Sequence, residues 1–152
     1  MSMNLKMTLL SILAGAFIGI QSSLSGQLGH QLKNPLYATF TIFAFSTFFL
    51  IIFFVFMKSP LPTMSLLESV PKHLWFTGSL LSIIALSIIY WQMPQIGVAP
   101  VVMGVIVGQI VISIVASHFG WFNLPRSILT LEKMIGIGLV LIGLYFINGG
   151  NK

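Results

Sequence analysis

The stretch LYATFTIFAFSTFFLIIFFVFM, residues 36–57, carries no charged side chain from end to end. A bilayer core of roughly 30 Å is crossed by about 20 helical residues, so this stretch has the length and composition of a transmembrane span. Inside lipid a segment must satisfy its own backbone hydrogen bonds. Helix is therefore the expected conformation, even though β-branched residues are frequent here.

Further apolar runs of similar length occur at about residues 7–28, 74–92, 98–117 and 129–147. Only 6% of the 152 residues are charged and 57% are hydrophobic, whereas about a quarter of a soluble chain is charged. The sequence therefore predicts an all-α integral membrane protein with five transmembrane helices in one bundle. Residues 1–152 are expected to form a single transmembrane domain.

The basic residues are scattered singly between the apolar runs and form no cluster that could bind nucleic acid. With five spans, one side of the membrane carries Lys6, Lys58, Lys72, Arg126 and Lys133, and the other carries Lys33 and Lys152. The positive-inside rule then predicts a cytoplasmic N-terminus. Because the excess is small, both a single and a dual topology stay open.

The first span ends in FIGIQSSLSGQLGHQL, residues 17–32, which is unusually polar for a membrane segment. On a helical wheel one face gathers the small residues Ser11, Gly15, Ser22, Ser25, Gly26 and Gly29. Gln21 lies on the flank of this face. Two hypotheses stay open: the face packs against another helix, at roughly 0.6 kcal/mol per hydrogen bond, or it lines a cavity that a solute crosses.

The fourth span repeats this pattern. Gly15 and Gly19 form a GxxxG pair, as do Gly104 and Gly108, and such pairs are predicted to serve helix packing. Gln109 and Ser113 follow at four-residue spacing. Two prolines are expected to shape the helices: Pro94 should end the third span, and Pro100 should kink the fourth.

Tyr90 and Trp91 stand at the end of the third span. They suit either an interfacial aromatic belt or a wall that faces a cationic or aromatic solute. No span contains an acid in its interior, and His30, His73 and His118 lie at span ends. With no cysteine and no nucleophile–base set, the sequence predicts neither an enzyme nor a metal site, and no cofactor.

Several motifs together resemble a known family over nearly the whole chain. They are the glycine-led first span with Gln21, NPLYATF at 34–40, YWQMPQIGVAP at 90–100 and GQIVISIVASHFGW at 108–121, followed by a glycine-rich last helix. In this order they resemble the half-size, five-helix members of the drug/metabolite transporter superfamily, in the bacterial YdcZ-like branch. The chain departs from that family at Ser25, where Asn is frequent, and at Ser117, where an acid is frequent, which puts ion coupling at Ser117 in doubt.

The resemblance implies a multi-pass protein of the bacterial inner membrane that forms half of an inverted-repeat transporter. Its expected partners are the lipid bilayer, a small-molecule substrate, and itself or a homologous half-transporter in the opposite orientation. The leading hypothesis is a drug/metabolite transporter subunit that works by alternating access as an antiparallel dimer. The predicted substrate-binding residues are Gln21, Ser22, Ser25, Tyr90, Trp91, Gln109 and Ser113.

Two alternatives stay open. The chain could be a structural or accessory membrane subunit that transports nothing itself. It could also be half of a lipid-linked carrier flippase, in which Lys72, Arg126 and Lys133 would face the headgroups. The low charge favours a neutral or lipophilic-cation solute, because a dianion would meet no buried basic residue.

Overall fold

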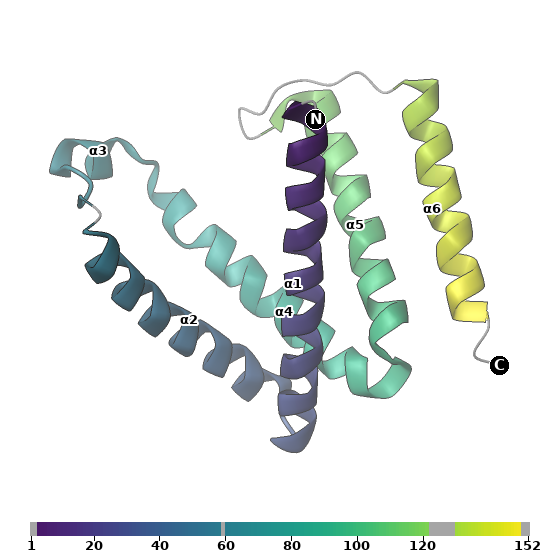
Figure 1. The fold of residues 1–152 in the computed structure, drawn as a ribbon, viewed down its shortest axis with the longest axis horizontal. Helices are drawn as coiled ribbons and strands as arrows, with labels where there is room; N and C mark the ends of the chain where they lie inside the picture. The colour runs from purple at the N-terminus through teal and green to yellow at the C-terminus, as the bar shows by residue number, and fades with distance from the viewer. Residues whose placement is uncertain (1–2, 59, 122–129, 150–152) are drawn as a thin grey trace. The chain divides into compact units, whose positions relative to one another are not determined.

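The computed structural model describes residues 3–58, 60–121 and 130–149, and every regular element in these ranges is helical (Figure 1). The elements are α1 (Met3–Gln31), α2 (Pro35–Met57), α3 (Met64–Ser69), the 3-10 helix η1 (Lys72–Trp75), α4 (Thr77–Ile96), α5 (Val98–Phe119) and α6 (Leu131–Gly149). They fall into two compact units, Met1–Gln95 and Ile96–Lys152.

Within the described residues, four helical segments are long and apolar enough to cross a membrane: Leu5–Gln31, Pro35–Met57, Lys72–Ile96 and Val98–Phe119. They correspond to the first four predicted spans, and the all-helical membrane class is confirmed. The fifth predicted span corresponds to α6, whose apolar stretch Met134–Phe146 is shorter. The five-helix bundle stays a prediction, as does the single domain.

The turn between α1 and α2 is fixed by backbone and side-chain caps. The N–H of Asn34 donates to the carbonyl of Gly29 at 3.0 Å, and the N–H of Lys33 donates to His30 at 3.1 Å. These two bonds form a Schellman motif, with Lys33 in the left-handed region at φ 53°. The Asn34 side chain then accepts from the N–H of Leu36 at 2.9 Å and caps α2.

The prediction for Pro94 is wrong, and the reason given for a kink at Pro100 does not apply. Pro94 does not end the third span, because α4 continues to Ile96 and stops only at Gly97, whose φ of +90° no helix can continue. Pro100 occupies the third position of α5. The N–H groups of the first helical turn have no intrahelical partner in any helix. Pro100 therefore removes no bond that α5 would otherwise make, which takes away the expected reason for a kink.

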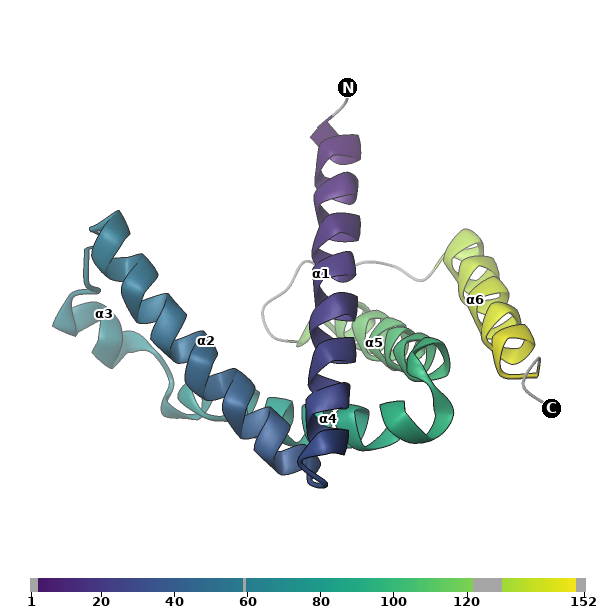
Figure 2. The ribbon, with the colours of Figure 1, turned by 60° about the horizontal axis from the view of Figure 1, so that its bottom comes forward.

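In the first unit, α1, α2 and α4 pack together near the α1–α2 turn (Figure 2). A Cβ built at Gly29 would lie 3.4 Å from both Ala38 and Pro35 of α2. A Cβ at Gly26 would lie 3.1 Å from the Cβ of Met93 in α4. The core of this unit therefore depends on the last turns of α1, while most large apolar side chains of α2 are exposed, as lipid-facing side chains would be.

In the second unit, α5 packs on α6 through Val107 and Ile110, which face Ile137, Val140 and Leu141. The predicted packing glycines lie elsewhere. At Gly15, Gly19, Gly104 and Gly108, a built Cβ would meet no neighbouring atom of the described chain within 4 Å. Their role in helix packing stays a prediction, and it would require a surface other than the contacts described above.

Candidate functional site

A hydrogen bond between side chains joins the first span to the third. The amide Nε2 of Gln21, on α1, donates to the hydroxyl of Tyr90, on α4, at 2.8 Å. The same nitrogen donates to the hydroxyl of Ser25 at 3.3 Å. Gln21 is half-buried, whereas only 1% of the Tyr90 surface is exposed. The two residues stand 69 positions apart in the chain and meet only because α1 and α4 cross here.

Ser22 and Ser25 complete the cluster. The hydroxyl of Ser22 donates to the side-chain oxygen of Gln21 at 3.4 Å, which is a long bond. The hydroxyl of Ser25 donates to the backbone carbonyl of Gln21 at 2.7 Å. Both serines are buried. Gln21, Ser22, Ser25 and Tyr90 are called the polar cluster below.

The spacing of small residues on α1 explains why the polar cluster forms. Ser22, Ser25 and Gly29 recur at three and four residues and therefore share one face of the helix. Gly29 has no side chain, so Tyr90 can approach until its Cβ lies 3.7 Å from a Cβ built there. Within this face, Ser22 and Ser25 are buried, so their hydroxyls point inward.

The polar cluster is uncharged and internally bonded. Among the described residues no buried side-chain nitrogen or oxygen lacks a hydrogen-bond partner. In the same part of the chain no group of three potential metal ligands occurs. The cluster can therefore donate and accept hydrogen bonds, but it offers no charge to hold an ion and no base to take up a proton.

Trp91 lies apart from the polar cluster. It follows Tyr90 directly, and one helical step of about 100° turns its side chain to the other side of α4, where 57% of its surface is exposed. The structure therefore does not bring the two aromatic side chains together as one wall. Substrate binding by Trp91 stays a prediction, and its exposure is equally that of a residue in the aromatic belt.

Gln109 and Ser113 belong to the second unit and are both exposed on α5. The hydroxyl of Ser113 donates to the backbone carbonyl of Gln109 at 2.6 Å, as serines inside apolar helices often do. An exposed amide on a membrane span needs a polar neighbour or water. The predicted role of Gln109 and Ser113 in substrate binding stays a prediction.

A second polar contact of the first unit was not predicted from the sequence. The hydroxyls of Thr39, on α2, and Ser87, on α4, lie 3.1 Å apart, and Thr39 is 2% exposed. A signal was present in the sequence. Both spans carry hydroxyl residues eight positions apart, Thr39 with Thr47 and Ser79 with Ser87, so each pair lies near one face of its helix.

Comparison with known protein families gives a match over nearly the whole chain. The model of the family described as "Putative inner membrane exporter, YdcZ" matches residues 6–146, which is nearly the whole chain. No curated protein and no solved structure matches the chain. The resemblance drawn from the sequence motifs is thereby confirmed at the level of the family.

Proposed function

This chain belongs to the YdcZ branch of the drug/metabolite transporter superfamily, and on that premise we propose that it exports a small molecule whose passage is guided by the polar cluster. The single observation that carries the proposal is the bond between Gln21 and Tyr90. This bond joins neutral hydrogen-bonding groups of two membrane spans at the point where the spans cross.

The bonds within the polar cluster are suited to exchange. Hydrogen bonds between membrane helices contribute only about 0.6 kcal/mol on average, so the amide of Gln21 can leave Tyr90 for a solute at little cost. A passing solute that offers one donor or acceptor would replace the lost bond. Gln21 is half-buried, whereas Ser22, Ser25 and Tyr90, to which its side chain is hydrogen-bonded, are buried.

The uncharged lining favours a neutral or lipophilic-cation solute, since a buried charge without a counter-charge is costly. We further propose that two copies, or this chain and a homologous half-transporter, pair in opposite orientations and alternate access between the two sides. The small charge bias across the membrane supports this pairing, because a chain of nearly balanced charge can insert both ways.

The test replaces Gln21 with Leu and measures efflux from proteoliposomes of two probes, the cation ethidium and the neutral N-phenyl-1-naphthylamine. We expect the unchanged protein to export at least one probe, and Gln21→Leu to lose that transport. The fold should persist, because the lost bonds are worth at most about 1.7 kcal/mol each. Gln27→Leu is the matched control, since Gln27 is exposed on the same helix. Equal transport by both variants would contradict a role of Gln21 in the pathway.

A structural subunit is the second candidate, and one observation favours it. Gln21 already finds its hydrogen-bond partners inside the chain, as a residue that only packs would. This candidate predicts that Gln21→Leu and Tyr90→Phe lower thermal stability by similar, non-additive amounts. It also predicts that no probe is transported by the unchanged protein or stabilises it.

A further inference from the structure

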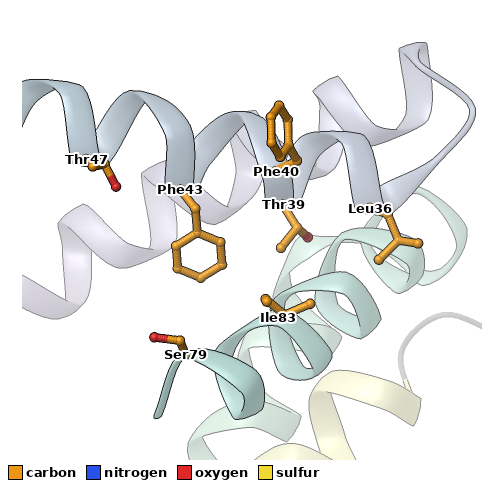
Figure 3. A pocket seen from close by; sticks show the side chains of 7 residues that line it. All are labelled: Leu36, Thr39, Phe40, Phe43, Thr47, Ser79 and Ile83. Atoms are coloured by element: carbon orange, nitrogen blue, oxygen red, sulfur yellow. The ribbon is translucent and has the colours of Figure 1, made fainter. Parts of the chain in front are cut away.

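A groove of about 510 Å³ lies between α2 and α4, beside the contact of Thr39 with Ser87 (Figure 3). It is lined by Leu36, Thr39, Phe40, Phe43, Thr47, Ser79 and Ile83. This lining is mainly apolar, carries two aromatic rings and three hydroxyls, and holds no charged side chain. Volume and composition are those of a small-molecule pocket, for which roughly 300–1,000 Å³ is typical.

The groove follows the register of the two helices. Thr39 and Ser87 touch at one end. One turn further along both helices, Phe43 and Ile83 face the hollow together, and Thr47 lies with Ser79 at the opposite end (Figure 3). The bonded hydroxyls of Thr39 and Ser87 therefore lie at one end of the groove, and the hydroxyl residues Thr47 and Ser79 line its other end from opposite helices.

The hydroxyls of Thr47 and Ser79 differ from others in these helices. Thr39 and Thr41 each donate to the backbone carbonyl four residues earlier, at 3.1 and 2.8 Å. Within the described chain neither Thr47 nor Ser79 makes such a bond or any other side-chain hydrogen bond. In an apolar surrounding an unpaired hydroxyl is costly, so both groups are available to a bound molecule.

We propose that this groove binds an uncharged, mainly apolar molecule that carries an aromatic ring and one hydrogen-bonding group. The ring would lie between Phe43 and Ile83, and the polar group would bond to Thr47 and Ser79. The claim that the groove binds a solute on its way out rests on the proposed function. The claim that it binds a small molecule rests on the geometry of the groove alone.

Two other occupants fit less well. A lipid acyl chain would fill the apolar part but could bond to neither hydroxyl. One turn of helix occupies roughly 400–600 Å³, from its 5.4 Å pitch and its diameter of 10–12 Å, so a partner's span would place only about one turn in the groove. A compact aromatic molecule uses both the volume and the two hydroxyls.

The chain contains no cysteine, so single-cysteine variants report on one position each. In lipid nanodiscs, Ile83→Cys is labelled with N-ethylmaleimide in the presence and absence of 1-naphthol. Ile84→Cys is the matched control, because it is the next residue of α4, is similarly exposed and does not line the groove. With 1-naphthol at ten times its Kd, labelling of Ile83→Cys should slow about tenfold by mass action, and labelling of Ile84→Cys should not change.

Two further probes test the stated chemistry. 1-Methylnaphthalene has a similar shape but no hydrogen-bonding group, and it should bind about three- to tenfold more weakly than 1-naphthol, as the loss of a typical hydrogen bond implies. This difference should disappear when Thr47→Val and Ser79→Ala are introduced together. 1-Naphthylmethylammonium should protect weakly, because no acidic residue lines the groove.

Three results would overturn the proposal. Equally slowed labelling of Ile83→Cys and Ile84→Cys would mean that 1-naphthol only partitions into lipid. Unchanged labelling of Ile83→Cys would mean that lipid or a partner already occupies the groove. Rapid disulfide formation between Thr47→Cys and Ser79→Cys that 1-naphthol does not slow would mean that the helices simply close. Labelling does not measure transport, so the two proposals can fail separately. If 1-naphthol protects Ile83→Cys but no probe is exported, only the proposed function is contradicted. If a probe is exported but 1-naphthol gives no protection, only the groove as a binding site is contradicted.

Discussion

At the scale of single residues, two glycines of α1, Gly26 and Gly29, lie where other helices pack closely, whereas Gly15 and Gly19 do not. A Cβ at Gly26 would lie 3.1 Å from Met93, so a methyl group there needs its neighbour to shift, whereas a Cβ at Gly29 would reach Ala38 and Pro35 at 3.4 Å, the near limit of ordinary contact. The spacing of three between Gly26 and Gly29 was visible in the sequence, but so was the spacing of Gly15 and Gly19, which meet no neighbour in the described chain. Spacing alone could not tell these pairs apart, because it does not show where a second helix crosses.

Gly26→Ala should therefore destabilise the first unit, whereas Gly15→Ala should not. The added Cβ at position 26 would lie 3.1 Å from the Cβ of Met93, which is fixed to its backbone and cannot rotate away. Overpacking of this kind typically costs about 1–3 kcal/mol. Thermal unfolding in detergent with both variants measures it. A stability of Gly26→Ala equal to that of Gly15→Ala would show that α1 and α4 are not packed as described.

Polar contacts at this scale were partly predictable. The bonds from Gln21 to Ser25 and from Ser25 back to Gln21 follow from their separation by four residues on one helix. The pairing of Gln21 with Tyr90 did not follow, because a wheel shows which face is polar but not the height at which another helix meets it. The contact of Thr39 with Ser87 could not be predicted either, because the sequence does not show at which height α2 and α4 meet.

At the scale of elements, hydropathy located the helices and backbone chemistry set their ends. The four long spans were predictable because apolar length is a strong signal in a bilayer. Their ends were harder to predict, since glycine and capping bonds terminate these helices where proline was expected to do so. The short helices α3 and η1 carried no comparable signal in the sequence.

Gly97 and Gly120 should respond differently to substitution, although both have positive φ. Gly97 has φ 90° and ψ 164°, a region open essentially to glycine alone, whereas Gly120 has φ 67° and ψ 34° in the left-handed helical region that Asn tolerates. Gly97→Asn should lower the free energy of unfolding by about 1–3 kcal/mol. Gly120→Asn should lower it much less, because Asn tolerates the left-handed helical region. Comparing the melting temperatures of the two variants checks this, and similar losses would contradict the assigned backbone of the α4–α5 junction.

At the scale of the whole molecule, the proposed pairing of opposite orientations depends on a small charge difference. It can be tested by fixing each orientation separately. Ser65→Lys with Glu68→Lys adds positive charge to the loop between α2 and α4, on the side predicted to be cytoplasmic. The second variant favours the opposite orientation. Gln31→Lys with Gln95→Lys adds positive charge to the opposite side, and Lys58→Asn with Lys72→Gln removes it from the first side. Asn is chosen at position 58 because it tolerates the left-handed backbone there.

If two copies work in opposite orientations, each fixed variant should be inactive alone, because it supplies only one orientation. Co-expression of the two should restore export of the probe that the unchanged protein transports, since each variant then finds its complement. Reporters at the C-terminus that read the cytoplasmic and external sides separately establish that each variant is fixed. Full export by one variant alone would contradict the antiparallel pair while leaving the polar cluster and the groove untouched, because both are built within residues 21–90 of a single chain.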